Sequence, residues 1–262
     1  MKRLDSRCAR AACLAIALAA GGSAQAEEGV FTLAAGAEYT TGEYGGDKSI
    51  DEVYVPVTGY YDTETFTLRL TVPFLQVRAP EGTISEGPGG EIIIGEGPRS
   101  TESGIGDVIA ALTVYDVYRS PGGAFALDLT GKIKFGTADE EKGLGTGEND
   151  YSAQVDLFRF FDRFTAIGSL GYTVRGDPDD VDLDNAMFVS VGFSYRVSPA
   201  TRFGAFYDYR EASLSSNDDP QELSVFAAWR VAPTWVLRGY ALAGLSDSSP
   251  DFGIGVTASK EF

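Results

Sequence analysis

The segment FALDLTGKIKF, residues 125–135, alternates between apolar and polar side chains. Its apolar positions are Phe125, Leu127, Leu129, Ile133 and Phe135, and between them stand Asp128, Thr130, Lys132 and Lys134. A period of two places successive side chains on opposite faces of a β-strand. A strand of about ten residues with one apolar face and one charged face is typical of outer-membrane barrels, where lipid lies outside and a polar lumen lies inside.

The same alternation recurs along most of the chain, and helical periodicity is hard to find. Such segments begin near residues 31, 50, 65, 107, 124, 150, 164, 186, 201, 222, 234 and 252. Their connectors alternate between short ones, such as 62–64, and long acidic ones, such as 138–149. The sequence therefore predicts an all-β fold, a closed antiparallel transmembrane up-and-down β-barrel of about 12 strands with short periplasmic turns and longer acidic outer loops. A soluble β-sandwich also alternates and is the alternative fold.

The two ends of the chain carry signals of export and assembly. Residues 1–26, MKRLDSRCARAACLAIALAAGGSAQA, have a basic start, a short apolar run and a small-residue close. This pattern predicts a cleavable secretory signal peptide over 1–26 and a barrel over 27–262, since the apolar run is too short for a membrane anchor. The last segment, DFGIGVTASKEF, alternates up to the final residue, Phe262. We interpret it as the closing strand and Phe262 as the aromatic signal that the outer-membrane assembly machinery reads.

Composition excludes several classes of function. The chain has no histidine, which rules out Ser-His-Asp and Cys-His catalysis and the usual zinc sites. Both cysteines lie in the predicted signal peptide, so no thiol chemistry is expected after cleavage. The formal charge of −17 argues against a nucleic-acid partner, which would require a basic surface. The sequence thus predicts no enzyme, no cofactor and no metal, and its expected partners are outer-membrane lipid, lipopolysaccharide, the assembly machinery and small-molecule solutes.

Charged residues on the polar face define the predicted lumen. The predicted solute path consists of Arg69, Asp107, Asp128, Lys132, Lys134, Asp156, Arg175, Arg196, Asp208, Arg230 and Arg238. Rows of opposite charge can orient solutes in a water-filled constriction, or they can pair and close a narrow interior. Twelve strands give a bore between the filled eight-strand barrel and the open sixteen-strand porin, so the sequence leaves both alternatives standing.

The longest connector, EGTISEGPGGEIIIGEGPRSTESG (81–104), contains the apolar residues Ile92, Ile93 and Ile94. Exposed apolar clusters are unusual in an outer loop. We predict either a lid over the barrel mouth that contacts an apolar solute, or an outer hairpin that extends the neighbouring strands. Aromatic residues near the strand ends, Tyr54, Tyr60, Tyr115 and Phe160 among them, are interpreted as membrane-interface belts. The glycines of GLGTGEND (143–150) are interpreted as turn and loop residues.

Three segments resemble a known family. They are VYVPVTGYYDTETFTLRLTVPFLQV (53–77), SGIGDVIAALTVY (103–115) and FALDLTGKIKFGTADEEKGLGTGENDYSAQVDLF (125–158). They are similar to the bacterial outer-membrane family described as "putative MetA-pathway of phenol degradation", whose members are also called transporters. The matching residues are Val72, Pro73, Gly104, Gly106, Asp107, Gly145, Thr146, Gly147, Asp150 and Tyr151. One departure is FGTAD (135–139), which stands where the family has Pro-Thr-Gly-Asp.

The resemblance implies a barrel that takes up aromatic or hydrophobic compounds, and it supplies no catalytic residues. Together with the residue patterns, it predicts an outer-membrane channel for passive uptake of small solutes, aromatic or hydrophobic compounds among them. The alternative is a structural or surface-interaction barrel whose lumen is closed. In both cases the expected location is the bacterial outer membrane.

Overall fold

The structure is a computed structural model that describes residues 29–90, 92–178 and 181–262. The predicted signal peptide, residues 1–26, lies outside the described residues. No helix in these ranges is long and apolar enough to cross a membrane.

Thirteen strands of the described ranges form one antiparallel sheet. They are β1 (Val30–Gly42), β2 (Ile50–Asp62), β3 (Phe66–Pro80), β6 (Arg99–Ile105), β7 (Val108–Arg119), β8 (Phe125–Phe135), β9 (Asp150–Phe161), β10 (Phe164–Val174), β11 (Ala186–Arg196), β12 (Thr201–Arg210), β13 (Gln221–Ala232), β14 (Trp235–Gly244) and β15 (Phe252–Glu261). The short strands β4 (Ile84–Ser85) and β5 (Ile92–Ile93) pair only with each other, and a single 3-10 turn, η1, covers Glu140–Lys142.

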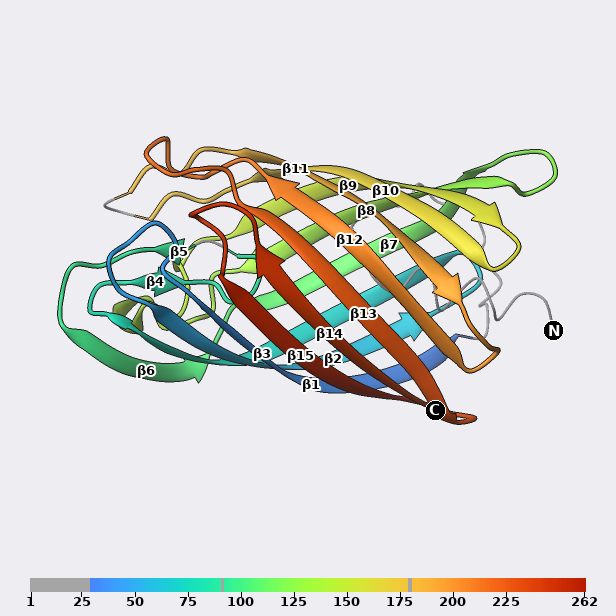
Figure 1. Cartoon of the computed structure of the whole chain (residues 1–262), viewed down its shortest axis with the longest axis horizontal. Coiled ribbons are helices and arrows are strands. Elements are labelled where there is room, and N and C mark those ends of the chain that lie inside the picture. Colours follow the sequence, from blue (N-terminus) through green and yellow to red (C-terminus); the bar gives the residue numbers. More distant parts are fainter. Residues whose placement is uncertain (1–28, 91, 179–180) are drawn as a thin grey trace, which may run out of the picture.

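The sheet closes into a ring of twelve strands, which confirms the predicted barrel (Figure 1). β1 pairs with β2 on one side and with β15 on the other, and β2 pairs with β3. β3 pairs with β7 near its start and with β6 near its end. Only Gly106 and Asp107 separate β6 from β7, so β6 extends β7 past this break. Each strand of the ring begins within about one residue of its predicted position, because the two-residue period is a local signal.

A pair of prolines marks the break between β6 and β7. Pro56 on β2 lies directly opposite Pro73 on β3, and neither has an N–H to donate to the ladder. The carbonyl of Pro73 instead accepts the amide of Gly106 at 3.0 Å. The Val-Pro strand end and the Gly-x-Gly-Asp segment of the sequence therefore meet at one point of the barrel wall.

The two ends of the barrel differ. At one end, here called the turn end, short turns join the strands. The first residue of β1 and the last residue of β15 also lie at this end (Figure 1). The opposite end, the loop end, carries the described parts of the long connectors, which are 43–49, 81–90, 92–98, 136–149, 175–178, 181–185, 211–220 and 245–251. Phe262 completes the closure at the turn end, where its amide donates to the carbonyl of Phe31 at 2.8 Å and the two rings lie 6.0 Å apart.

The outer face of the ring is a band of exposed apolar side chains. Leu70, Val225 and Val256, from three different strands, are 51–56% exposed. A continuous exposed apolar band fits the hydrocarbon core of a membrane, not water. The interface-belt interpretation is wrong for Tyr54, Tyr60, Tyr115 and Phe160. Alternate residues of a strand point to the same face, and we call the positions that point into the barrel the inward parity. These four aromatic residues share the inward parity of Glu52, Thr113 and Phe158, so they face the lumen.

Candidate functional site

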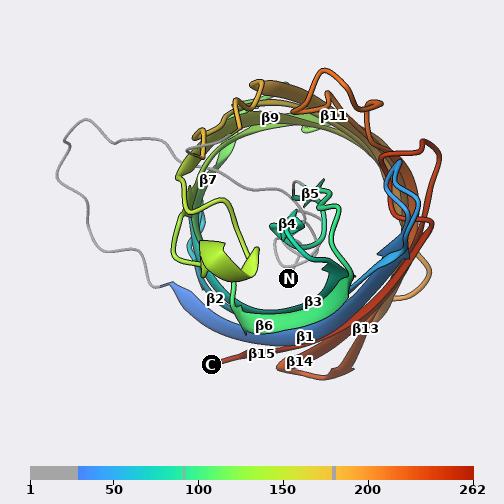
Figure 2. The same ribbon diagram turned by 90° about the vertical axis from the view of Figure 1, so that its left-hand side faces the viewer.

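The described residues of the segment 81–98 (81–90 and 92–98), which carry β4 and β5, fold into the barrel and lie within the ring (Figure 2). We call it the inward loop. Its Ile92 and Ile94 pack against a buried apolar cluster that includes Ile50, Leu75 and Leu144. In the connector 81–104, β6 pairs with β3 and extends the barrel wall, as the outer-hairpin alternative predicts, while the residues before β6 turn inward. The contact of the isoleucines with an apolar solute stays a prediction.

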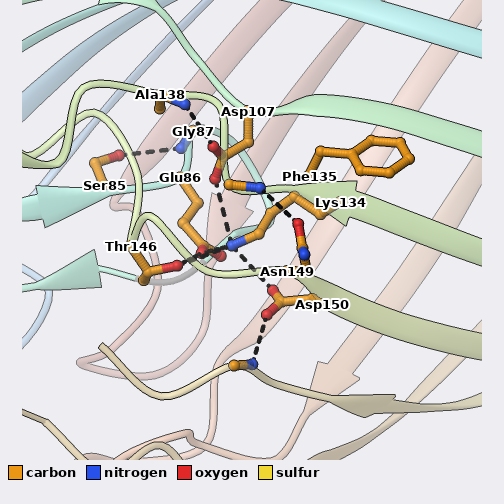
Figure 3. Close-up of polar contacts among 12 residues, drawn as sticks. Ser85, Glu86, Gly87, Asp107, Lys134, Phe135, Ala138, Thr146, Asn149 and Asp150 are labelled. Atoms are coloured by element: carbon orange, nitrogen blue, oxygen red, sulfur yellow. Dashed lines mark hydrogen bonds and ion pairs between the residues drawn. The ribbon is translucent and has the colours of Figure 1, made fainter. Parts of the chain in front are cut away.

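Lys134 ties the inward loop to the barrel wall (Figure 3). Its ammonium contacts the carboxylate of Glu86 on the inward loop, and it lies 3.4 Å from Asp107 and 3.1 Å from Asp150. The side chains of these four residues, here called the Lys134 cluster, are 2–8% exposed. The hydroxyl of Thr146 completes the cluster at 3.1 Å from the ammonium. Three carboxylates around one ammonium form a strongly coupled network with little access to water.

The glycine-rich segment of the sequence makes room for this cluster. A Cβ at Gly145 would lie 2.7 Å from a carboxylate oxygen of Asp107. Gly143 has a left-handed backbone, with φ of 66°, and a Cβ there would overlap the carbonyl oxygen of Thr83. These glycines therefore permit close approach between the 136–149 loop and the inward loop, a role beyond the predicted turn geometry.

Asp107 also shapes the exit of β8. One of its carboxylate oxygens accepts the amides of Thr137 and Ala138, each at 2.9 Å. These two residues belong to FGTAD, the stretch that departs from the family pattern. The strand exit is therefore held by backbone amides, which any residue other than proline can supply.

Two further contacts fix the inward loop. The hydroxyl of Ser85 donates to the buried carboxylate of Glu52 on β2, which also accepts the hydroxyl of Thr40 at 2.9 Å. On the far wall, the guanidinium of Arg210 on β12 donates to the carbonyl of Gly89 at the loop tip. The inward loop is thus held from β2, β8 and β12 and reaches across the lumen.

A pocket lies at the loop end, between the tip of the inward loop and the facing wall. It is lined by Gly87–Gly90 on the loop side and by Glu52, Arg210, Glu222 and Leu242 on the wall side. Residues of the outer loops, such as Asp218 and Pro250, border it. This pocket is the candidate mouth of a path past the inward loop.

Nearer the turn end, the lumen wall carries aromatic rings that the sequence interpretation missed. Phe158 stacks on Phe160, with centroids 6.1 Å apart, and Phe206 stacks on Phe226 at 6.0 Å. The guanidinium of Arg238 lies 5.7 Å from the Phe226 ring. The sequence does contain a signal for this position. Phe158 stands two residues from Asp156 and Phe206 two residues from Asp208, so each shares a strand face with a predicted lumen residue.

The other predicted path residues lie at different depths. Asp156 accepts the hydroxyl of Ser169 at 2.6 Å, and Asp128 accepts the amide of Asp116 at 2.8 Å beside a bulge in β7. Arg69 on β3, Lys132 on β8, Asp208 on β12 and Arg238 on β14 all have inward parity.

The remaining predicted path residues lie near strand ends. At the turn end, Arg230 lies 3.3 Å from the carboxylate of Glu261, and Arg196 donates to the carbonyl of Asp162 at 3.2 Å. At the loop end, the amide of Arg175 donates to Asn185 at 3.0 Å. The predicted path residues therefore do not form a single site, since some stabilise turns and others belong to the Lys134 cluster.

One outer loop is held by a short side-chain hydrogen bond. The hydroxyl of Tyr209 donates to Asp219 at 2.6 Å, and the amide of Ala212 donates to the same carboxylate at 2.9 Å. These hydrogen bonds lower the pKa of Asp219 below its ordinary value, because they stabilise the charged form. Within the described ranges, no three side chains of Asp, Glu, Cys or His are grouped so as to hold a metal ion.

The fold is similar to that of solved outer-membrane barrels. The COG4313 outer membrane channel from Pseudomonas putida F1 superposes with a TM-score of 0.71 at 15% identity, over 94% of this chain and 100% of that chain. The KdgM porin superposes with a TM-score of 0.52 at 9% identity, over 88% of this chain and 99% of that chain. No curated protein sequence matches the chain. The family described as "Putative MetA-pathway of phenol degradation" matches residues 17–262, and the chain therefore belongs to this family.

Proposed function

We propose that this protein is an outer-membrane channel through which small solutes pass passively, aromatic or hydrophobic compounds among them. The observation that carries the proposal is the pocket beside the inward loop, lined by Glu52, Arg210 and Glu222. The loop crosses the lumen there and leaves at its tip a recess lined by both charged and apolar side chains. Membership of the family and the fold shared with the Pseudomonas putida channel support the same conclusion.

The walls of the lumen suit solutes that are partly polar and partly apolar. A solute at the mouth meets charged side chains, and deeper on β12 and β13 it meets the stacked rings of Phe206 and Phe226. Charged groups orient a solute, and aromatic faces replace the water that an apolar surface loses. This combination favours small amphipathic molecules over large polar ones.

The proposed location is the bacterial outer membrane, reached by way of the signal peptide. The exposed apolar band would contact lipid, and the acidic loops would face lipopolysaccharide. Phe262, at the seam between β1 and β15, is the proposed recognition point for the assembly machinery.

A second candidate is a barrel whose lumen the inward loop keeps closed. The three attachments of the inward loop, to Glu52, Lys134 and Arg210, favour this alternative. The two candidates differ in whether the wild-type barrel conducts.

The experiment compares the purified wild-type barrel with a variant in which residues 84–94 are replaced by a short Gly-Ser linker. Conductance is measured in planar bilayers, and solute flux is measured by liposome swelling. Selective flux through wild type and larger, less selective flux through the variant support the channel. Flux through the variant alone supports the closed barrel, and no flux through either contradicts the proposed channel.

A further inference from the structure

We propose that Lys132, together with Arg69 and Arg210, forms a binding subsite in the lumen for the carboxylate of a small anionic solute, and that the ring of Phe188 supports the solute's planar part. This inference rests on the proposed channel function and narrows its solute class. It assigns different roles to two lysines of one strand, Lys132 and Lys134.

The surroundings of Lys132 leave its ammonium available to a solute. Lys132 faces the lumen two residues deeper along β8 than Lys134. Its lateral neighbours in the register are the small residues Ala111 on β7 and Ser152 on β9. Within the described ranges, its ammonium takes part in no hydrogen bond or ion pair, whereas Lys134 contacts three carboxylates. A cation partly removed from water gains from an anion that enters its vicinity.

Two further cations surround this position. Arg69 on β3 lies opposite Ala111, so that only this small side chain stands between Arg69 and Lys132 in the register. Lys132 also interacts electrostatically with Arg210 from the far wall. Glu86 and Asp150, the two carboxylates that also act electrostatically on Lys132, each pair with Lys134. Three cations that act on one stretch of lumen raise the local positive potential and attract an anion.

Phe188 provides a flat apolar surface next to Arg210, one of these cations. It lies directly between Gly171 on β10 and Arg210 on β12 in the register. A Cβ at Gly171 would overlap the Phe188 ring, so the ring lies against the wall where only glycine leaves room. The ring is half-buried, and its free surface faces the lumen. A planar solute that stacks on this ring can present its carboxylate to the positive charge of the adjacent Arg210 guanidinium, which also donates to the carbonyl of Gly89.

The test uses benzoate and benzamide, which have the same shape and differ in charge. Flux of each is measured in liposomes that contain wild type, Lys132→Gln or the control Lys142→Gln. Lys142 is an exposed residue of the 136–149 loop that pairs with the exposed Asp139, so its loss changes the charge of the protein equally without touching the lumen wall.

We expect the wild type to favour benzoate and Lys132→Gln to lower the benzoate-to-benzamide ratio by about tenfold, the effect of a lost hydrogen bond to a charged group. Lys142→Gln should keep the wild-type ratio. Phe188→Ala should slow both compounds. Lys132→Gln should fold normally, because Lys132 has no ion pair to lose, and resistance to unfolding by urea checks this.

An unchanged ratio in Lys132→Gln would overturn the subsite while the channel function stands. Absence of flux for both compounds through wild type would overturn the channel function and the subsite together. The acidic outer loops repel benzoate equally in wild type and Lys132→Gln, so the comparison between these two is independent of that repulsion. Lys142→Gln makes one of these loops more acidic by one charge and measures how much the repulsion contributes.

Discussion

Replacement of Lys134 by methionine removes one ammonium from the Lys134 cluster and keeps most of the side-chain volume. The carboxylates of Glu86, Asp107 and Asp150 then remain with 2–8% of their side chains exposed, so water cannot take the place of the ammonium. Loss of one partner from a buried ion pair costs about 3–5 kcal/mol of stability. We therefore expect Lys134→Met to lower the free energy of unfolding by that amount.

The loss should depend on pH in a defined direction. Without the ammonium, the native state favours protonated carboxylates, so it binds more protons than the unfolded chain. Stability then falls as pH rises, and the variant should be closer to wild type at pH 5 than at pH 8. In the same variant, the inward loop loses its attachment to β8, and the single-channel current should become larger and noisier.

The assay is urea unfolding in lipid vesicles, followed by the fluorescence of Trp229 and Trp235, together with single-channel recording. Lys142→Met is the matched control, because Lys142 and Asp139 form an exposed pair 3.1 Å apart with side chains 47% and 44% exposed. Such a surface pair contributes under about 1 kcal/mol. If Lys134→Met costs no more than the control, or if its current matches that of wild type, the cluster does not hold the inward loop.

Three other perturbations test separate parts of the structure. Gly143→Ala should lower the free energy of unfolding by at least about 1 kcal/mol because of its left-handed backbone, and by more because the new Cβ overlaps Thr83. Gly168→Ala is the control: no atom lies within 4 Å of its new Cβ, so it should unfold nearly as wild type does in the same urea assay. Arg210→Gln should free the loop tip at Gly89 and increase current fluctuations at an unchanged unfolding midpoint; traces identical to wild type would speak against that attachment. Deletion of Phe262 should reduce the yield of inserted barrel, measured by heat-modifiable gel migration, more than it changes transport per inserted barrel, and normal insertion would contradict its role in assembly.

The sequence was sufficient to predict the strands and the closure of the barrel. Each strand produces its own two-residue period, and the even number of strands brings both chain ends to the same side. Parity also indicates which aromatic residues face the lumen. For Tyr54 and Phe160, closeness to a strand end predicts a membrane belt whereas the two-residue period predicts the lumen face, and the structure agrees with the period.

The path of the inward loop could not be predicted in this way. Its attachments join residues 48 positions apart, at Glu86 and Lys134, and 121 positions apart, at Gly89 and Arg210. No local period records such contacts. Lys132 and Lys134 therefore look equivalent in the sequence, and only the packing of the loop against the wall distinguishes them.

The seam between β1 and β15 has a consequence for the timing of folding. It joins strands from the two ends of the chain, as the contact between Tyr240 and Glu38 across 202 residues illustrates. Contacts of such long range form slowly, because the entropy of closing the intervening chain is lost before the contact contributes. Until β15 pairs, β1 and β14 each keep an unpaired strand edge, which is prone to aggregation. The pairing of β15 therefore removes both open edges of the sheet in one step.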